Sequence, residues 1–520
     1  MTTDAELVDR TRAWIEADPD PETRAELERL LAAGDFAALR ACMSGPLAFG
    51  TAGLRAAVGA GSGRMNRATV IRATRGLADF LANRRDGARS LPVVVGSDAR
   101  SSSQTFLHDV VAVFAAAKVP VRWFTEPVPT PLVAYAARVL GATAGVVVTA
   151  SHNPREDNGY KVYLDDAVQL VAPHDRAIEQ AIRAVGPAGR VPRAELDLLA
   201  AVPAPFRPEV EPLSTDALFE RYLAEVLAHL GPREPNAELR LAYTPLHGVG
   251  WKFARRALAR AGYPDVRVVP EQAEPNGAFP TTPFPNPEVP ATLELGLAFA
   301  EREQADLLLA NDPDADRLAA AVPTPAGRFV RLSGNQLAVL LADARLSAPP
   351  GRNRALALTS VVTTPLVEAV ARGRGAHVER TLTGFKWLWS AALELERRGA
   401  GHFAYACEEA LGYSVTPAVR DKDGISAAIA LADLLSECRR RGQGLLDRLS
   451  EIERRHGVFA SVQRNVALAA SDPGHALAAI ERLVAAPPDA LAGRRVHAVR
   501  DYRVNAAERP PWLPATELVE

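Results

Sequence analysis

Two adjacent side chains that could do chemistry, Ser151 and His152, follow an apolar, β-branched run at residues 146–148. Such a run predicts a buried parallel strand, and Pro154 opposes its continuation. We expect the Ser151 hydroxyl on a tight turn at the carboxyl end of a sheet, where open α/β folds place their ligands. His152 could then move protons. For an isolated pair the favoured interpretation is a turn with a solvated histidine, so other residues must decide.

Three carboxylates at alternate positions, Asp312, Asp314 and Asp316, follow a second predicted strand at residues 305–310. Oxygen donors that converge from one loop suit a hard cation, and Mg²⁺ prefers a few carboxylates together with phosphate or water oxygens. A solvated acidic turn is the alternative, but three like charges at this spacing repel one another unless a cation lies among them. An EF-hand is not expected, because the Gly and Glu of its loop pattern are missing downstream.

Three cationic residues stand in loops beside glycine or strand signals. Arg55 belongs to a glycine-dense stretch that allows close backbone approach, so it is a candidate anion contact. The turn at residues 157–161 would deliver Lys161 to the sheet edge that carries Ser151. Lys386 lies in a Thr-Gly-Phe-Lys loop, where a surface lysine is an equal alternative.

Two further pairs of charged residues lie within residues 403–424. Glu408 and Glu409 are adjacent on an extended segment, so their side chains should point to opposite sides. One of them could reach a ligand hydroxyl while the other packs or is solvated. Arg420 and Lys422 alternate with aspartates, and a salt-bridged turn is as good an interpretation of this loop as phosphate binding.

Taken together, the serine, the carboxylate loop and the cations predict phosphoryl transfer. A serine nucleophile needs a positioned base and a phosphorus whose surrounding charge is neutralised by metal and cations. A Ser-His-Asp hydrolase could also use the serine. However, the G-x-S-x-G elbow is absent, and three clustered aspartates would be surplus to that chemistry.

Strand and helix patterns alternate along most of the chain, as in α/β folds with parallel strands. Residues 4–42 predict a helical arm without chemistry of its own, and the Pro- and Ala-rich residues 185–213 predict a linker. We expect an arm and serine domain at 1–205, a metal-loop domain at 206–325, a sugar-loop domain at 326–440 and a C-terminal domain at 441–520.

Composition narrows the class of protein. The 520 residues carry a net charge of −2, so no overall field attracts nucleic acid or an anionic membrane. The three cysteines are far apart, which argues against disulfides or a zinc site and suits a reducing compartment. No secretory signal or uncharged apolar run of about 18 residues is present. We expect a cytoplasmic protein that is a monomer or weak dimer.

The motifs resemble those of the α-D-phosphohexomutases, the phosphoglucomutase/phosphomannomutase superfamily. The Ser-His-Asn-Pro and Asp-x-Asp-x-Asp-Arg motifs are the most specific of them. The Glu-Glu-Ala-x-Gly-Tyr form and the N-terminal arm look most like the phosphoglucomutase-2 type branch, which includes phosphopentomutases and a glucose-1,6-bisphosphate synthase. The matching segments are FGTAGLR at 49–55, TASHNP at 149–154, NGYK at 158–161, TPLHGVG at 244–250, DPDADR at 312–317, TGFK at 383–386 and EEALGY at 408–413.

The resemblance implies a role for each candidate residue. Ser151 would be the phosphoserine that exchanges a phosphoryl group with the sugar, primed by a sugar 1,6-bisphosphate. The carboxylates of Asp312, Asp314 and Asp316 would hold Mg²⁺ with an oxygen of that phosphoserine. The remaining roles are general acid/base or phosphate contact for His152, Lys161 and Lys386, active-site cation for Arg55 and Arg317, and substrate contact for Glu408, Glu409, Arg420 and Lys422.

The family fold implies three α/β domains with mixed sheets and a smaller α+β lid. Many members have Glu-x-Ser where this chain ends the motif in Ala410, so one hydroxyl ligand is lost. The family's Arg-x-Ser-Gly-Thr loop, which grips the distal phosphate, is not found in residues 441–520. We therefore expect a truncated lid.

The expected reaction interconverts the 1- and 6-phosphates of a hexose, with glucose first, through a bisphosphorylated sugar. The alternatives on the same machinery are a phosphopentomutase or a glucose-1,6-bisphosphate synthase. An alternative of another class is a weakened phosphosugar-binding protein without a complete lid, because a lost phosphate clamp removes strong charge-assisted contacts.

Overall fold

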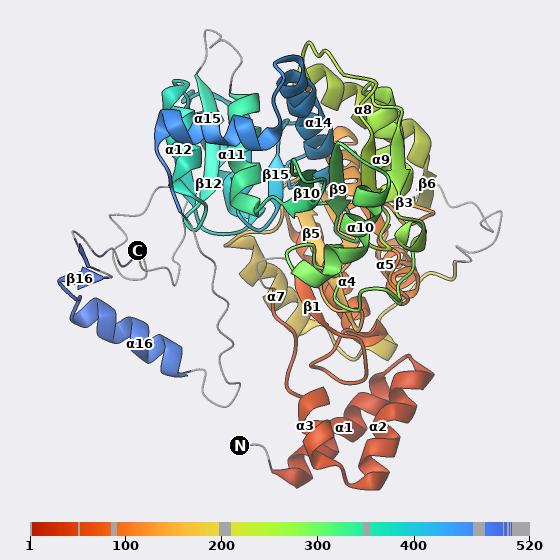
Figure 1. Ribbon diagram of the computed structural model, residues 1–520. Coiled ribbons are helices and arrows are strands. Elements are labelled where there is room, and N and C mark those ends of the chain that lie inside the picture. Colours follow the sequence, from red (N-terminus) through yellow and green to blue (C-terminus); the bar gives the residue numbers. More distant parts are fainter. Residues whose placement is uncertain are drawn as a thin grey trace.

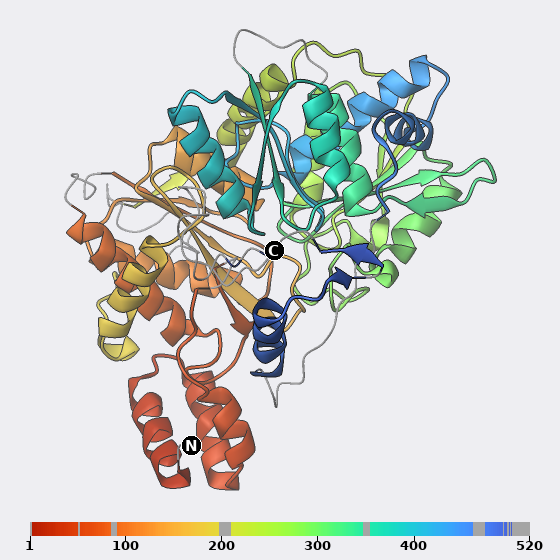
Figure 2. The same ribbon diagram turned by 90° about the vertical axis from the view of Figure 1, so that its left-hand side faces the viewer.

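A computed structural model describes residues 3–49, 53–84, 91–196, 210–346, 354–460, 474–491, 493–496, 499 and 501. In these ranges a helical arm projects from a larger body in which helices cover three mixed sheets (Figures 1 and 2). The predicted α/β class with mixed sheets is confirmed. None of the described helices has the length and apolar content needed to cross a membrane.

The arm is built from helices that the sequence starts with strong capping signals. Thr3 and Glu6 form a reciprocal capping box, and Asp20 caps the second helix, which begins with Pro21. Leu7, Leu27 and other apolar residues form a separate small core. The helices are α1 (Asp4–Ala17), α2 (Pro21–Ala33) and α3 (Phe36–Cys42).

The first sheet has the strand order β1-β5-β4-β2-β3-β6, with β1, β5 and β4 antiparallel and the remaining neighbours parallel. Its strands are β1 (Leu54–Ala57), β2 (Val93–Ser97), β3 (Val121–Phe124), β4 (Ala144–Val148), β5 (Asp157–Leu164) and β6 (Val210–Leu213). Its helices are α4 (Arg67–Asn83), α5 (Ser103–Ala116), α6 (Thr130–Val139) and α7 (His174–Ala184), with the short η2 (Ala188–Arg190).

Both faces of this sheet are buried, which explains why its central strands are continuously apolar. Alternate residues of β2 point to opposite faces: Val93 and Val95 belong to the core that contains α4 and α5, and Val94 to the core that contains α6. Helices therefore close both sides of the sheet, and only its strand ends are left to carry a site.

The second sheet has the order β11-β10-β9-β7-β8. Strands β7, β8 and β9 are parallel, β10 pairs antiparallel with β9, and β11 pairs antiparallel with β10. Its strands are β7 (Leu241–Thr244), β8 (Val266–Val268), β9 (Leu307–Asn311), β10 (Leu318–Pro323) and β11 (Phe329–Arg331). Its helices are α8 (Thr215–Leu230), α9 (Gly250–Arg260) and α10 (Glu294–Arg302), with the short η3 (Pro270–Gln272) and η4 (Pro290–Leu293).

The third sheet has the order β13-β12-β14-β15, with β15 antiparallel and the others parallel. Its strands are β12 (Ala355–Ser360), β13 (His377–Thr381), β14 (His402–Glu408) and β15 (Gly412–Ser414). Its helices are α11 (Gly334–Arg345), α12 (Pro365–Gly373), α13 (Phe385–Arg397), α14 (Gly424–Arg440) and α15 (Leu445–His456).

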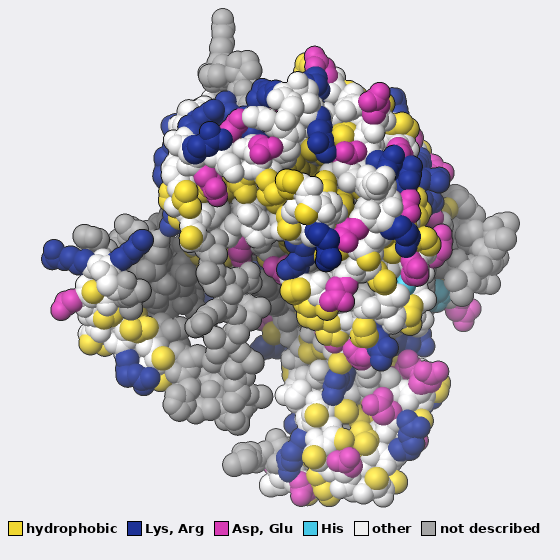
Figure 3. Space-filling view, in the orientation of Figure 1, with side chains coloured by type: hydrophobic (Ala, Val, Ile, Leu, Met, Phe, Trp, Pro, Cys, Tyr) yellow, Lys and Arg dark blue, Asp and Glu magenta, His cyan; other side chains and the backbone are white. Residues whose placement is uncertain are grey.

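The predicted domain boundaries stay predictions. The position near 205 lies outside the described residues, and β6, just after it, pairs with β3 of the first sheet. Beyond 440, α15 packs on α11 and α12. The predicted lid at 441–520 lies partly outside the described residues, which beyond α15 include α16 (Gly474–Ala485), β16 (Ala490–Leu491) and β17 (Arg494–Arg495). On the face shown in Figure 3, acidic and basic side chains are interspersed.

Close packing of α4 on α7 yields a stability prediction. A Cβ at Gly76 would lie 2.5 Å from Ile182 Cγ1 and 2.7 Å from the Ile182 backbone nitrogen. Gly76→Ala should therefore lower the free energy of unfolding by about 1–3 kcal/mol, although Ala is the better helix former. Thermal unfolding measures the change. The matched control is Gly186→Ala, where a Cβ meets nothing within 4 Å; a stabilised Gly76→Ala protein would contradict the packing argument.

Candidate active site

Ser151 lies just beyond β4 and meets the aspartate loop of the second domain. Its Oγ donates a hydrogen bond to Asp312 Oδ2 at 2.7 Å, and its side chain is buried. Ser151 has a φ of +52°, in the left-handed region that non-glycine residues seldom occupy. Such backbone conformations persist only where the surroundings hold them, and they concentrate at functional sites. The predicted tight turn is present, and it is directed at the predicted carboxylates.

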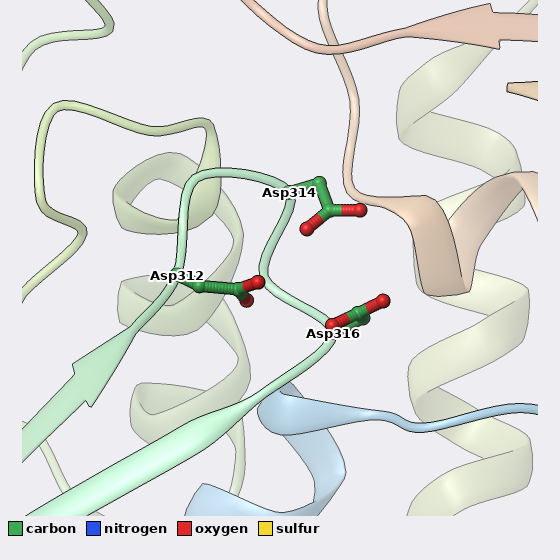
Figure 4. A group of neighbouring side chains, drawn as sticks. All are labelled: Asp312, Asp314 and Asp316. Carbon is green, nitrogen blue, oxygen red and sulfur yellow. The ribbon is translucent and has the colours of Figure 1, made fainter. Parts of the chain in front are cut away.

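The aspartate loop joins β9 to β10, so β9 delivers it to the end of the second sheet (Figure 4). Ala315 takes a φ of +56°, which turns the chain back into β10. Asp312, Asp314 and Asp316 are fully buried, and each can offer an oxygen within 4.8 Å of the others. In the described part of the chain, this is the one group of three or more His, Cys, Asp or Glu that could hold a metal ion.

Two lysines offset the charge of the loop. Lys161, on β5, donates from Nζ to Asp314 Oδ2 at 2.7 Å and to Asp316 Oδ2 at 2.9 Å. Lys422 lies 3.3 Å from Asp316 Oδ2. Burial by itself would lower the pKa of Lys161, but the carboxylates of Asp314 and Asp316 raise it above its usual value. Lys161 and Lys422, two of the three lysines predicted from the sequence, therefore reach the loop, and Lys161 is held there as an ammonium ion.

The carboxylates fit a divalent cation. Asp314 Oδ1 and Asp316 Oδ1 are buried and accept no hydrogen bond, although buried carboxylate oxygens are normally paired. Burial and repulsion from Asp316 and Asp314 raise the pKa of Asp312 well above its usual value. Oxygen donors with spare lone pairs in one loop are the ligands that Mg²⁺ prefers. We infer that these three residues would hold Mg²⁺ beside Ser151.

His152 is a neutral neighbour of the serine. Its Nδ1 lies 3.2 Å from Ser151 Oγ. Burial, with the nearby Arg317 and Arg55 guanidinium groups, lowers the pKa of His152 well below its usual value. A neutral imidazole has one ring nitrogen free to accept a proton, so this side chain can exchange a proton with a group at Ser151.

Two arginines, which help to lower the pKa of His152, retain unused donors. Arg55 donates from Nη1 to Asn153 Oδ1 at 3.1 Å, and Arg317 donates from Nη1 to Glu288 Oε2 at 3.1 Å. The Nε of each is buried without a hydrogen-bond partner. Guanidinium groups with free donors beside a serine are suited to an anion such as phosphate.

The sugar-loop residues reach the same place through β14. Glu408 Oε1 accepts from the Gly384 backbone N at 2.5 Å, and burial raises the pKa of Glu408. Glu409 turns away, and its Oε2 accepts from Ser360 Oγ at 3.0 Å and from Thr363 Oγ1 at 3.3 Å. The two glutamates therefore diverge, with Glu408 at the end of β14 and Glu409 in the turn that follows it. The Leu318 backbone N donates to Leu411 O at 3.0 Å, which ties this turn to the aspartate loop.

Some predicted residues are placed elsewhere by their contacts. Arg420 donates from Nη1 to the Asp166 carbonyl oxygen at 2.6 Å. Lys386, on the first turn of α13, lies over the Trp387 ring, and burial lowers its pKa. Neither residue has a described contact with Ser151 or the aspartate loop, and the roles of all the predicted site residues stay proposals. Part of the Phe49–Arg55 motif, residues 50–52, lies outside the described residues.

Two residues that contact the serine and aspartate loops were not predicted from the sequence. Thr130 donates from Oγ1 to Asp314 Oδ2 at 2.7 Å and from its backbone N to Asp314 O at 3.0 Å. Arg100 donates to four carbonyl oxygens of the loop that starts at Ser151. A signal was present, because both residues follow parallel strands of the first sheet, whose carboxyl ends meet at one edge.

Metal binding by the loop yields a prediction. In protein treated with a chelator, added Mg²⁺ should raise the midpoint of thermal unfolding, because a ligand of the folded state stabilises it. Asp314→Ala should remove this increase. As a control, Asp306→Asn changes a carboxylate just before β9 that pairs with Arg439, and it should keep the increase. A full Mg²⁺ effect in Asp314→Ala would contradict the assignment.

Comparison with known families matches three stretches of the chain. Residues 46–187 match "Phosphoglucomutase/phosphomannomutase, alpha/beta/alpha domain I". Residues 220–327 match domain II of the same family, and residues 333–454 match domain III. These stretches contain the serine loop, the aspartate loop and the sugar loop, respectively.

Comparison with individual proteins also finds phosphosugar mutases and related enzymes. A phosphopentomutase from Mus musculus is 36% identical over 472 residues, which cover 87% of this chain and 74% of that protein. A glucose 1,6-bisphosphate synthase from Homo sapiens is 35% identical over 480 residues, which cover 88% of this chain and 75% of that protein. A crystal structure from Thermus thermophilus, described as a phosphomannomutase, has a TM-score of 0.65 at 26% identity and covers 80% of this chain and 85% of that one.

The resemblance seen in the sequence motifs is thus confirmed, including the likeness to the branch with phosphopentomutase and glucose 1,6-bisphosphate synthase. The chain belongs to the phosphoglucomutase/phosphomannomutase superfamily and is a phosphosugar mutase, an intramolecular phosphotransferase of that type.

Proposed function

We propose that this enzyme interconverts a pentose 1-phosphate and the corresponding pentose 5-phosphate through a phosphorylated Ser151. One observation carries the reaction: the Ser151 hydroxyl meets Asp312 at 2.7 Å in a buried site that also holds two further carboxylates and two lysines. Carboxylates that would hold a cation, together with ammonium groups, supply the positive charge that phosphoryl transfer needs.

In the proposed reaction, the phosphoryl group passes from Ser151 Oγ to a free hydroxyl of the bound sugar phosphate. The bond from phosphorus to Oγ breaks as the bond to the sugar oxygen forms, the sugar hydroxyl gives up its proton, and Oγ gains one. The resulting bisphosphate then turns over in the site, and its other phosphoryl group returns to the serine. The sugar leaves with its phosphate at the other end, and Ser151 is phosphorylated again.

The surrounding residues would orient groups and move protons. Neutral His152, 3.2 Å from Ser151 Oγ, is the residue placed to take and return a proton there. Lys161 is a poor base because two carboxylates hold it as an ammonium ion. Bound Mg²⁺ would supply positive charge to the phosphoryl oxygens. Arg55 and Arg317, each with an unused Nε donor, would bind phosphate oxygens.

Two observations support a pentose over the hexose that the sequence motifs first suggested. The relatives include a phosphopentomutase, at 36% identity over 87% of the chain. In the sugar loop, Glu408 alone keeps a carboxylate near Arg317 and Lys422, because Glu409 is turned to Ser360 and Thr363 and Ala410 carries no ligand. A loop with one hydroxyl ligand suits a sugar with fewer hydroxyl groups.

A glucose-1,6-bisphosphate synthase is the second candidate, supported by the Homo sapiens relative of that name at 35% identity. It would use the same serine and cations but release the bisphosphate that a mutase retains. The sugar product that leaves the site therefore distinguishes a mutase from a synthase.

Phosphorylation of the serine can be tested directly. Intact mass of freshly purified protein should show a species heavier by one phosphate, and peptide mapping should place the phosphate on Ser151. Ser151→Ala should lose both this species and turnover, since no other described hydroxyl donates to Asp312. A phosphate mapped to a different residue would refute the assignment.

Substrate choice is tested by assaying the 1-phosphates of ribose, deoxyribose, glucose and mannose. We expect kcat/KM for ribose 1-phosphate to exceed that for glucose 1-phosphate at least about tenfold, a difference of about 1.4 kcal/mol in transition-state binding. A preference for glucose or mannose would restore the hexose interpretation. Accumulated glucose 1,6-bisphosphate would identify the synthase, and phosphorylated Ser151 without turnover of any sugar would identify a binding protein.

A further inference from the structure

Arg100 makes an unusual set of contacts with the serine loop. From Nη1 it donates to the carbonyl oxygens of Pro154 at 2.7 Å and Asp157 at 2.8 Å. From Nη2 it donates to those of Ser151 at 2.7 Å and Asn153 at 2.6 Å. The residue is 3% exposed. One planar guanidinium thus holds four backbone oxygens of the segment from Ser151 to Asp157.

These contacts address a conformational problem at Ser151. Its φ of +52° is unfavourable for a residue with a Cβ, so the turn needs support from outside its own backbone. The Ser151 backbone N finds a partner in Thr149 Oγ1 at 2.8 Å, and the Ser151 carbonyl oxygen finds Arg100. Both polar groups of the strained peptide are therefore fixed by side chains.

Asp98 anchors the arginine from behind. Its Oδ2 lies 3.3 Å from Arg100 Nε and accepts from Thr149 Oγ1 at 2.6 Å. Its Oδ1 accepts from the Arg100 backbone N at 3.0 Å and from Ser103 Oγ at 2.6 Å. The carboxylate thus links the end of β2, which carries Arg100, to the end of β4, which carries Ser151.

The second domain covers this arrangement. The Phe279 ring lies 5.1 Å from the Arg100 guanidinium carbon, in a cation–π contact. A Cβ at Gly277 would lie 2.5 Å from the Ser101 backbone N, so the covering loop can approach this closely only with glycine there. The Arg155 backbone N also donates to Pro283 O at 2.9 Å. The serine loop is consequently held between Arg100 and the domain that carries the aspartates.

We propose that Arg100 is a positioning residue for phosphoryl transfer: it holds the Ser151 turn so that Oγ faces Asp312. This inference rests on the proposed function of Ser151. Arg100 has no described contact with Ser151 Oγ, the three aspartates or His152, so it acts through the backbone of the loop. Only a planar fork of donors reaches four carbonyl oxygens at once, and a lysine ammonium in its place cannot.

The test compares Arg100→Lys and Arg100→Ala with the parent enzyme. Misplacement of a reacting atom by about 1 Å costs about 10²-fold in rate, so kcat should fall about 10²-fold or more while KM changes less than about threefold. Guanidinium ion, added to Arg100→Ala below the concentration that unfolds the parent, should restore part of kcat. The matched control is Arg155→Ala, in the same loop but exposed and paired with Glu156, which should keep parental kcat.

Each outcome decides the inference. A folded Arg100 variant with parental kcat, or with only a raised KM, would overturn it. If both Arg100 variants fail to fold, Phe279→Leu decides, because it removes only the ring over the guanidinium: a lower kcat supports positioning, and an unchanged kcat overturns it. The Ser151→Ala enzyme separates the two proposals. Turnover in Ser151→Ala would refute the proposed function, whereas an inactive Ser151→Ala beside a fully active Arg100→Lys would refute only the role of Arg100.

Discussion

Burial of three carboxylates on one short loop is the constraint to which the rest of the structure responds. An ionised carboxylate in a protein interior is costly unless it is paired, and three neighbours repel one another as well. Lys161 and Thr130 of the first domain donate hydrogen bonds to Asp314. Lys422 of the third domain forms an ion pair with Asp316. Because these partners come from the first and third domains, both domains must meet the loop at Asp314 and Asp316 for it to be tolerated.

Buried hydroxyl–carboxylate pairs join the third domain to the first and to the second. Tyr163 Oη donates to Asp421 Oδ2 at 2.5 Å, and Tyr222 Oη donates to Asp423 Oδ2 at 2.7 Å. Burial and the neighbouring carboxylate raise the pKa of each tyrosine well above its usual value, so both remain donors. These bonds fix the two residues that flank Lys422, and they place its ammonium group beside Asp316.

The sequence allowed the serine and aspartate loops to be predicted because each depends on a local rule: a buried strand ends and its polar loop lies at the sheet edge. The α/β class followed from the same alternation. Arg100 and Thr130 were not predicted, because their partners lie on other loops and only the strand order brings them together. Glu409 could be expected to diverge from Glu408, but what it would contact could not. No local pattern encodes which sugar is bound, so the hexose expected from the motifs stays a prediction.

The same constraint links phosphorylation to metal binding under the proposed function. A phosphoserine adds about −1.5 to −2 charges beside carboxylates that already repel one another, and Lys161 and Lys422 are already occupied by those carboxylates. The remaining positive charge would come from Arg55 and Arg317, whose unused Nε donors are buried, and from a Mg²⁺ ion, which Asp312, Asp314 and Asp316 would hold. Binding of the cation and addition of the phosphate should each favour the other, because coupling between two sites is reciprocal. A loop that its own charge destabilises in isolation would thus be most stable when the serine carries the phosphate and the aspartates hold the cation.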